Sequence, residues 1–175
     1  CKLYSINQVK IPFSKNMDLC IEDFIKKAKS VDMIYLDSPN NPTGFQFSNK
    51  DLEKLIKSFS GPIIIDEAYG EFSNSSVLRL IKKYPNLILV KTLSKAFGLA
   101  GLRIGYMIAD KKFTEIFSNV IQYPYPLNTL AIECGILAIE KSKQILSIFE
   151  VIKKQRVRII QNLKKYDAFD VFDSN

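Results

Sequence analysis

Short apolar runs alternate with amphipathic stretches along most of the chain. Residues 33–37, 63–66 and 87–90 are dominated by large apolar side chains, the pattern of strands that are buried on both faces. Between the first two runs, apolar residues recur at helical spacing, namely Leu52, Leu55, Ile56 and Phe59. Strands that alternate with helices predict βαβ units, so we expect an α/β fold with a mostly parallel sheet.

Caps and breakers predict the remaining elements. Pro12 allows only a short edge strand at 9–13, and Asp18 is the predicted cap of a first helix. Ser48 and Asp51 have the spacing of a capping box at the start of the next helix. The other predicted elements are a helix near 77–83, a strand at 103–109, and helices at 111–121, 128–142 and about 144–165.

Polar residues follow three of the predicted strands. The first strand runs into the turn-forming sequence SPNNPTG. The polar residues in question are Asn40 and Asn41 after the first strand, Asp66, Glu67 and Tyr69 after the second, and Thr92, Ser94 and Lys95 after the third. Because ligands bind outside the carboxyl ends of the strands in open parallel sheets, these sets would share one pocket if the strands are neighbours.

Lys95, at the mouth of the third strand, is the candidate reactive amine. Asp66 follows a wholly apolar run, so we expect a partly buried carboxylate that needs a positive partner. Arg103 can bind a phosphate in a bidentate manner, and the hydroxyls of Thr92 and Ser94 can donate to it. An amine, a carboxylate and a phosphate clamp are the groups that pyridoxal phosphate requires.

Each of these residues also has an ordinary interpretation. A lysine after a strand is usually a solvated loop residue, an aspartate before a helix is usually a cap, and NPTG is usually only a turn. Gly98, Gly101 and Gly105 match neither the GxGxxG nor the P-loop pattern. The order of the polar residues at successive strand ends nevertheless favours one shared site.

Composition argues against several other functions. The net charge is +7, but the lysines are scattered and no stripe mixes arginine with aromatics, so we expect no nucleic-acid partner. The sequence contains no histidine, which removes Ser–His–Asp and Cys–His catalysis and histidine metal sites within this chain. Cys1, Cys20 and Cys134 form no CxxC pair, which fits a reducing compartment. No apolar run is long enough to span a bilayer, so a cytoplasmic location without a membrane partner is expected.

Three motifs carry a family resemblance: SPNNPTG (38–44), DEAYGEF (66–72) and TLSKAFGLAGLRIGY (92–106). Together they resemble the fold-type I pyridoxal-phosphate-dependent aminotransferases, and within them most of all the histidinol-phosphate aminotransferases. The resemblance implies a three-layer α/β/α fold. In it, residues 1–142 would belong to the large cofactor-binding domain, incomplete at its N-terminal side. Residues 143–175 would be a long helix that leads into a mostly absent C-terminal small domain.

The resemblance also implies residue roles. Lys95 would hold the cofactor covalently and then act as base and acid in proton transfer. Asp66 would bind the pyridinium nitrogen, and Asn41 and Tyr69 would hydrogen-bond the 3′-oxygen of the cofactor. The implied catalytic residues are therefore Lys95, Asp66 and Tyr69.

The remaining implied contacts concern the phosphate and the substrate. Thr92, Ser94 and Arg103 would hold the cofactor phosphate, and the segment YPYPLN (123–128) would lie near the substrate. The residue that stacks on the ring and the arginine that binds the substrate would lie outside this chain. The resemblance further implies a homodimer.

The implied reaction belongs to histidine biosynthesis. It converts histidinol phosphate and 2-oxoglutarate to imidazole-acetol phosphate and glutamate, so the substrate is a small amino acid or amino-alcohol phosphate. Threonine-phosphate decarboxylase and aromatic amino-acid aminotransferases of the same family remain alternatives, because cofactor residues do not separate them. An alternative of another class is an inactive or sensor module that retains the fold.

Overall fold

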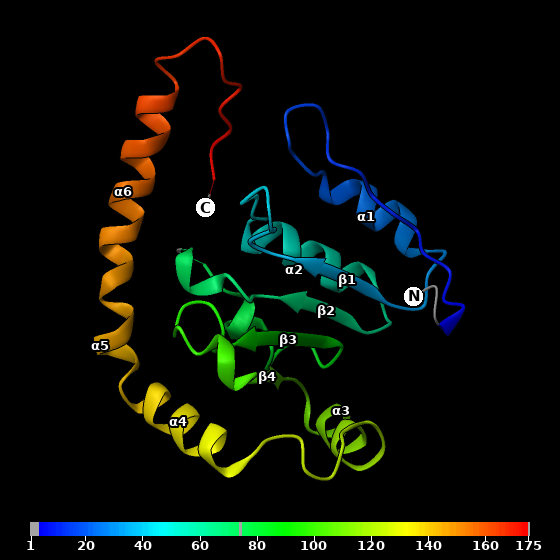
Figure 1. The fold of residues 1–175 in the computed structure, drawn as a ribbon. Helices are drawn as coiled ribbons and strands as arrows, with labels where there is room; N and C mark the ends of the chain where they lie inside the picture. The colour runs from blue at the N-terminus through cyan, green and yellow to red at the C-terminus, as the bar shows by residue number, and fades with distance from the viewer. Residues whose placement is uncertain (1–3, 74, 175) are drawn as a thin grey trace.

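A single mixed sheet organises the part of the chain that the computed structural model describes, residues 4–73 and 75–174 (Figure 1). Its strands, in the order β1-β2-β3-β4, are β1 (Ile34–Asp37), β2 (Ile63–Asp66), β3 (Leu87–Thr92) and β4 (Gly105–Ile108). β1, β2 and β3 are parallel, and β4 runs antiparallel to β3. The predicted α/β class with a mostly parallel sheet is thereby confirmed.

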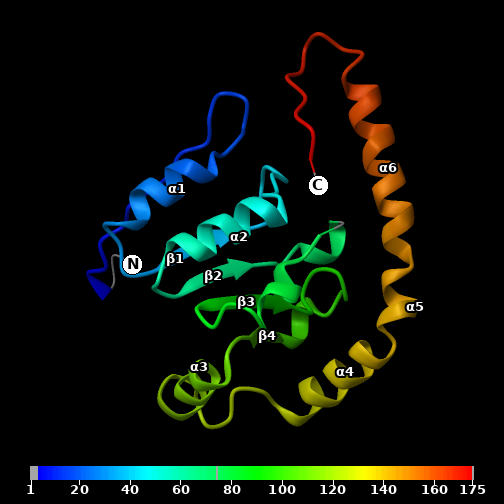
Figure 2. The ribbon, with the colours of Figure 1, turned by 180° about the vertical axis from the view of Figure 1, so that it is seen from behind.

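Helices precede, connect and follow the strands of this sheet. The α-helices are α1 (Ile21–Ala28), α2 (Asn49–Ser58), α3 (Lys111–Ile116), α4 (Thr129–Glu140), α5 (Ser142–Leu146) and α6 (Ile148–Leu163). Short 3-10 helices are η2 (Gly70–Phe72), η3 (Val77–Leu80) and η4 (Ala100–Leu102), and η5 (Phe117–Ile121) is a π-helical turn. Both ribbon views show α1 and α2 beside the sheet, whereas α6 passes on the side of the strands' carboxyl ends (Figures 1 and 2).

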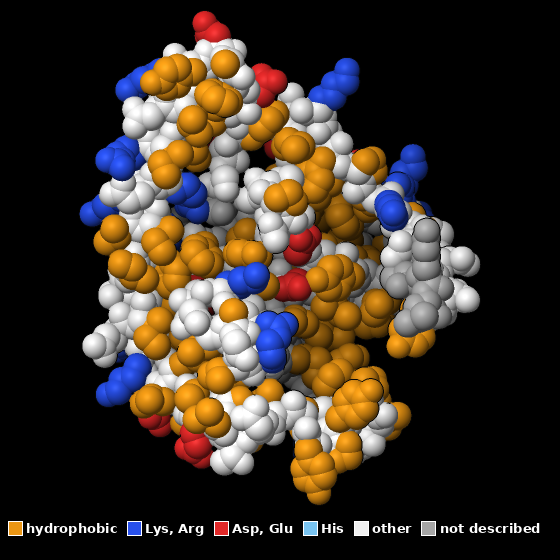
Figure 3. Space-filling model, viewed as in Figure 1, with side chains coloured by type: hydrophobic (Ala, Val, Ile, Leu, Met, Phe, Trp, Pro, Cys, Tyr) orange, Lys and Arg blue, Asp and Glu red, His pale blue; other side chains and the backbone are white. Residues whose placement is uncertain are grey.

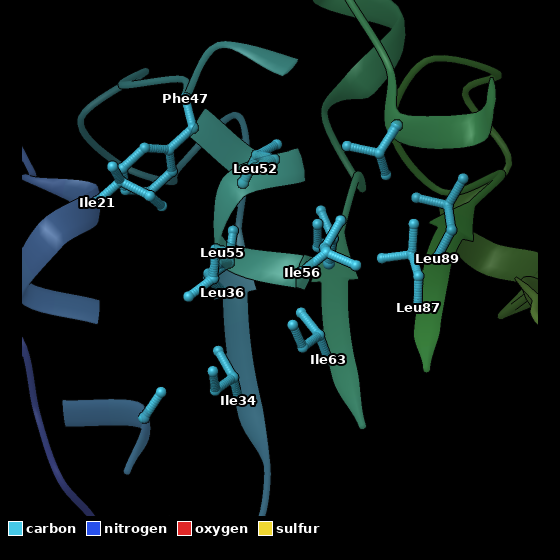
Figure 4. Packing of buried hydrophobic residues seen from close by; sticks show 13 residues of the cluster. Ile21, Ile34, Leu36, Phe47, Leu52, Leu55, Ile56, Ile63, Leu87 and Leu89 are labelled. Atoms are coloured by element: carbon cyan, nitrogen blue, oxygen red, sulfur yellow. The ribbon is translucent and has the colours of Figure 1, made fainter. Parts of the chain in front are cut away.

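The main core lies between α2 and one face of the sheet. Because side chains alternate along a strand, every second residue of β1, β2 and β3 faces the helices. Figure 4 shows this packing, and the residues that it labels are Ile21, Ile34, Leu36, Phe47, Leu52, Leu55, Ile56, Ile63, Leu87 and Leu89. Burying a side chain of this size stabilises the fold by roughly 1.5–3 kcal/mol. The core therefore holds the three parallel strands and their carboxyl ends in one register.

A second, smaller apolar cluster fixes the loop between β3 and β4. Leu93 and Ile104, at the two ends of that loop, pack with Ala131 of α4. Gly135 lets α4 approach Ile104 closely, because a Cβ at position 135 would lie 3.1 Å from Ile104 Cδ1. The loop that carries Lys95 is thus anchored at both ends.

Most of the predicted elements are confirmed, and the N-terminal region contains two errors. Residues 9–13 form no strand, and the carbonyl of Lys10 instead accepts a hydrogen bond from Lys27 Nζ at 2.8 Å. Asp18 does not cap α1, which begins at Ile21 after Cys20. Asp18 instead closes a turn with Ser14, whose N–H donates to the Asp18 carbonyl at 2.9 Å.

Two helices also differ from the prediction. Only Val77–Leu80 is helical in the predicted 77–83 segment, and it is a 3-10 helix capped by the Ser76 hydroxyl. The predicted helix 144–165 is divided at Ser147, whose hydroxyl donates to the Gln144 carbonyl at 2.7 Å. Such backbone-directed hydroxyls compete with regular helical geometry.

Further observations concern membrane spans, metal ligands and cysteines. Within residues 4–73 and 75–174, no helix combines the length and apolar character needed to cross a bilayer. In the same part of the chain, no group of His, Cys, Asp or Glu side chains forms a metal site. Cys20 and Cys134 are free thiols, while Cys1 lies outside the described residues.

Candidate functional site

The candidate site lies at the edge of the sheet where the three parallel strands end. The register aligns Asp37 with Asp66 and Asp66 with Val90, so the strand ends are direct neighbours. The loops after β1, β2 and β3 therefore emerge side by side. The expectation that these polar sets share one rim depended on strand order, and the order β1-β2-β3 meets it.

Asp66 is held by two neutral donors. Its Oδ2 accepts a hydrogen bond from the Tyr35 hydroxyl at 2.7 Å, and its Oδ1 accepts one from the Ala68 N–H at 2.8 Å. Asp66 is half-buried, as expected, but no lysine or arginine of the described residues forms an ion pair with it. The positive partner that the sequence predicted is thus replaced by a phenol and a backbone amide.

Asn41 and Tyr69 come together from different loops. The Asn41 amide Nδ2 donates to the Tyr69 hydroxyl at 3.3 Å. Asn41 follows the end of β1, and Tyr69 precedes the 3-10 helix η2 that follows β2. An amide and a phenol at this distance can both donate to a single oxygen, and their role toward a cofactor stays a prediction.

Two further polar residues at the end of β1 shape the loop that carries Asn41. Asn40 Nδ2 donates to both carboxylate oxygens of Asp37 at 2.9 Å, and its Oδ1 accepts from the Thr43 hydroxyl at 2.6 Å. Asp37 Oδ2 also accepts from the Asn41 N–H at 3.2 Å. Asp37 and Asn40 were visible in the sequence as polar residues at a strand end, but their partners were not.

Lys95 projects from the loop after β3 toward Tyr69. Its Nζ lies 5.4 Å from the centre of the Tyr69 ring, within the range of a cation–π contact. The side chain is exposed, and among the described residues its ammonium has no hydrogen-bond or ion-pair partner. Lys95 is therefore available for chemistry, in contrast to Lys91 at the end of the same strand, which is bonded to carboxylates.

The three residues predicted to bind phosphate lie on the same loop and differ in availability. The Thr92 hydroxyl donates to the Ile104 carbonyl at 3.0 Å and accepts from the Ser94 N–H at 3.1 Å, so its proton is already engaged. Arg103 is exposed, and its Nη1 donates to the Ala100 carbonyl at 3.1 Å. The rest of its guanidinium, together with the half-buried Ser94, remains open to an anion.

The backbone of this loop reverses direction through two left-handed residues. Gly98 has a φ of 69°, and an added Cβ would meet open space there, so the backbone conformation and not crowding favours glycine. Arg103 has a φ of 54°, which is uncommon for a residue with a side chain. The antiparallel strand β4 then begins at Gly105, opposite Thr92, and this brings Arg103 back to the β3 end.

Two hollows of the described surface lie away from Asp66 and Lys95. One of about 430 Å³ is lined by Pro42 and Thr43 together with Leu163 and residues 169–172 and 174. A second, of about 560 Å³, follows the inner side of α6. Neither is lined by Asp66 or Lys95, and the first borders the candidate site through Pro42 and Thr43, which follow Asn41. The segment 123–128 stays a prediction, with Tyr123 and Tyr125 exposed at 84% and 93%.

Sequence reasoning overlooked Tyr35 as part of the site. The signal was present, because Tyr35 is a tyrosine inside an apolar strand. It has the same position in β1 as Ile64 has in β2, and Asp66 comes two residues after Ile64 on the same face. Recognising that relation requires the strand register, which the sequence does not state.

Comparison with known proteins shows what the chain as a whole is similar to. The histidinol-phosphate aminotransferase of Sulfurisphaera tokodaii is 40% identical over 149 residues, which cover 82% of this chain and 41% of that protein. The crystal structure of the histidinol-phosphate aminotransferase from Clostridium acetobutylicum has a TM-score of 0.85 and 30% identity, and the match covers 93% of this chain and 50% of that one. The chain thus spans about half the length of the relatives it matches.

A second similar solved structure is that of an enzyme with a different reaction. L-threonine-O-3-phosphate decarboxylase from Porphyromonas gingivalis has a TM-score of 0.75 and 28% identity, and the match covers 82% of this chain and 45% of that one. The family model described as aminotransferase class I and II matches residues 1–175. The chain therefore belongs to the aminotransferase class I and II family.

Proposed function

We propose that this chain is the central part of a pyridoxal-phosphate-dependent aminotransferase, and that the full-length protein transfers amino groups between small molecules. The observation that carries the proposal is the convergence of Lys95, Asp66 and the Asn41–Tyr69 pair on one rim of the sheet. Family membership agrees with it.

The donor set fits pyridoxal phosphate in its chemistry. The free amine of Lys95 can bind an aldehyde, Asp66 can accept the N–H of a pyridinium ring, and the Asn41–Tyr69 pair can donate to a phenolic oxygen. Arg103 and Ser94 can hold a phosphate. When bound, pyridoxal phosphate supplies an electron sink that stabilises negative charge at the substrate Cα.

The residues of this chain then have separate tasks in the proposal. Lys95 Nζ would take a proton from the substrate Cα as a neutral amine and return it as an ammonium. Asp66, fixed by Tyr35 and Ala68, would bind the ring nitrogen and favour its protonated form. Arg103 and Ser94 orient the anion, and Tyr69 lies between the lysine and the oxygen-binding amide of Asn41.

An absorbance experiment on the full-length protein tests this assignment. Wild-type protein mixed with pyridoxal phosphate should develop the visible band of a lysine-bound cofactor, and borohydride should fix the label on Lys95. Lys95→Ala should abolish both signals. Lys111→Ala is the matched control, because Lys111 is an exposed lysine of α3, outside the loop that carries Lys95 and Arg103. A band that survives in Lys95→Ala would show that the wrong lysine was assigned.

For the substrate, we propose histidinol phosphate as amino donor and 2-oxoglutarate as acceptor, which is a reaction of histidine biosynthesis. The similarity to the histidinol-phosphate aminotransferases of S. tokodaii and C. acetobutylicum supports this choice. The test is to assay the full-length protein with histidinol phosphate, threonine phosphate and phenylalanine in parallel. Glutamate formation that depends on histidinol phosphate is the expected outcome.

The second candidate is a threonine-phosphate decarboxylase, which the similarity to the P. gingivalis enzyme supports. The two reactions differ in products, since the decarboxylase releases carbon dioxide and forms no keto acid. Carbon dioxide released from threonine phosphate without glutamate formation would replace the first proposal by this one.

We also propose that residues 1–142 belong to the large domain of the full-length protein, while 143–175 lead toward a small one.

We further propose that the full-length protein is a homodimer. Exposed apolar side chains on α4 support self-association (Figure 3). They are Leu130, Ile132, Ile136, Leu137 and Ile139, each between 44% and 67% exposed. Light scattering of the full-length protein should give twice the monomer mass.

A further inference from the structure

We propose that Tyr35 is a positioning residue for the site: its phenol fixes the Asp66 carboxylate in the orientation that binds the cofactor ring and withdraws negative charge from it. The inference rests on the proposed function, because it assigns Asp66 to the ring nitrogen. It adds a residue that none of the three family motifs contains.

The first argument is geometric. A carboxylate that is held at one oxygen can still rotate, whereas anchors at both oxygens fix its plane. Ala68 N–H holds Oδ1 at 2.8 Å and Tyr35 O–H holds Oδ2 at 2.7 Å. The distance to Tyr35 is that of a strong O–H···O⁻ hydrogen bond. Without Tyr35, the backbone amide alone would hold the carboxylate.

The second argument concerns the face of the sheet. The core residues of β1 and β2 are Ile34, Leu36, Ile63 and Ile65, so Tyr35 and Asp66 lie on the opposite face. Tyr35 is 58% exposed, and its ring therefore contributes little to the core. Its interaction with Asp66 is the feature that distinguishes it from the apolar residues of the same strand.

The third argument is electrostatic. Partial burial of the phenol and then the hydrogen bond to Asp66 raise the pKa of Tyr35, and the charges of Asp66 and Asp37 act in the same direction. The phenol therefore stays protonated at neutral pH and remains a donor. Asp66 of β2 and Asp37 of β1 are the charged groups that act on it, and Lys95 and Arg103 are the cations of the loop after β3.

The test compares Tyr35→Phe with the wild type in the full-length protein loaded with pyridoxal phosphate. Phenylalanine keeps the ring and removes only the donor. We expect roughly a tenfold loss of cofactor affinity, as for one hydrogen bond to a charged group. We also expect the pH midpoint of the visible band to move upward, because a carboxylate without its donor carries more negative charge and favours the protonated form of the bound cofactor.

Tyr84→Phe is the matched control. The Tyr84 hydroxyl also donates to a carboxylate, Glu53 Oε1 at 2.6 Å, but this pair links α2 to the segment before β3. Removing it should leave the midpoint of the band unchanged. A merely structural role of Tyr35 would lower stability without moving that midpoint, and an unchanged midpoint in Tyr35→Phe would overturn the inference.

A second measurement reads the contact without cofactor. The ¹³Cζ resonance of Tyr35 in the unloaded protein at neutral pH should move in Asp66→Asn and stay in place in Glu53→Gln. In the loaded protein, Tyr35→Phe should add no midpoint shift on the Asp66→Asn background, because Tyr35 acts through Asp66.

The two measurements separate the two proposals. If wild-type protein forms no band while the Tyr35 resonance responds to Asp66→Asn, the proposed function fails and the coupling of Tyr35 to Asp66 stands. If the resonance does not respond, the inference about Tyr35 fails whether or not the band forms.

Discussion

Lys91 is the second-to-last residue of β3. Its buried charge joins two segments of the site. Its Nζ lies 2.8 Å from Glu71 Oε1 and 3.3 Å from Glu67 Oε2. Burial disfavours the charged lysine, but the hydrogen bond and charge of Glu71 and the charge of Glu67 outweigh it, so the pKa of Lys91 is raised. Lys91 thus ties the strand that leads to Lys95 to the segment that follows Asp66.

We predict that Lys91→Met destabilises the fold by about 3–5 kcal/mol, the usual cost of leaving a buried ion pair without one partner. Glu67 is only 1% exposed and would keep an uncompensated charge, although the Ser76 hydroxyl and the Val77 N–H still donate to it. Urea unfolding at neutral pH measures the loss, because a raised lysine pKa contributes fully below about 10.5.

Two variants make this measurement specific. Lys91→Arg keeps the charge and should retain much of the stability. Lys111→Met removes an exposed lysine whose partner Glu115 is 3.7 Å away, and it should change stability by less than about 0.5 kcal/mol. Equal effects of Lys91→Met and Lys111→Met would contradict the predicted role of the buried pair.

At the same scale, the sequence identified residue types better than partners. Lys95, Asp66, Asn41 and Tyr69 were placed on one rim from their positions after strands, and the structure brings them together. The partner of Asp66 was missed, because a hydrogen bond between strands depends on register and not on spacing along one strand. The roles of these residues toward a cofactor stay predictions.

At the scale of elements, α2 is joined to the segment before β3 by one carboxylate. Glu53 Oε1 accepts hydrogen bonds from Lys83 Nζ and the Tyr84 hydroxyl, both at 2.6 Å. These two bonds lower the pKa of Glu53 from 4.5 to about 2. A lowered folded-state pKa contributes stability that is present above pH 4.5 and is lost as the pH falls toward 2.

We therefore predict that Glu53→Gln removes part of the acid sensitivity of the fold. The free-energy difference between wild type and variant should shrink as the pH falls from about 4.5 to about 2, and it should stay constant above that window. Denaturant unfolding at several pH values measures it. Glu115→Gln is the control, since that carboxylate is exposed and has only a lysine 3.7 Å away; a similar pH dependence in the control would argue against the assignment to Glu53.

Elements were predicted well where the hydrophobic pattern and the caps agreed. The three buried strands and α2 follow directly from them, and the Ser48 hydroxyl accepts from the Asp51 N–H at 3.1 Å as the capping pattern implies. The 9–13 strand was wrong because strand pairing needs a neighbour that local sequence does not reveal. The antiparallel direction of β4 was likewise not encoded in its own residues.

At the scale of the whole molecule, α6 is attached through few contacts. Phe149 is 4% exposed and packs edge-on against Phe72 of η2, with ring centres 4.7 Å apart. Arg156 Nη1 donates to the Phe72 carbonyl at 3.5 Å. Much of the rest of α6 is exposed, so these contacts help to fix the position of the helix beside the carboxyl ends of the strands (Figures 1 and 2).

We predict that Phe149→Ala releases α6 from the sheet, at a cost of about 3–5 kcal/mol for a buried phenylalanine. Hydrogen exchange of the amides in Ile148–Leu163 should accelerate, while that of β2 and β3 should change little. Val157→Ala, at a half-exposed position of the same helix, is the control and should leave exchange unchanged. Exchange that rises equally in the strands would show that α6 is part of one cooperative unit with the sheet.

The loop between β3 and β4 is closed at its base by Thr92 opposite Gly105, and it exposes Lys95 and Arg103 within one short excursion. Both are residues after which trypsin cleaves, and exposed loops are where proteases nick folded proteins. A lysine whose amine is covalently bound to a carbonyl compound no longer serves as a cleavage site, whereas an arginine that only hydrogen-bonds a phosphate can still be cleaved. Limited trypsin digestion should therefore report how much of the lysine is loaded. The ratio of cuts after Lys95 to cuts after Arg103, measured by mass spectrometry, should fall as the loaded fraction rises.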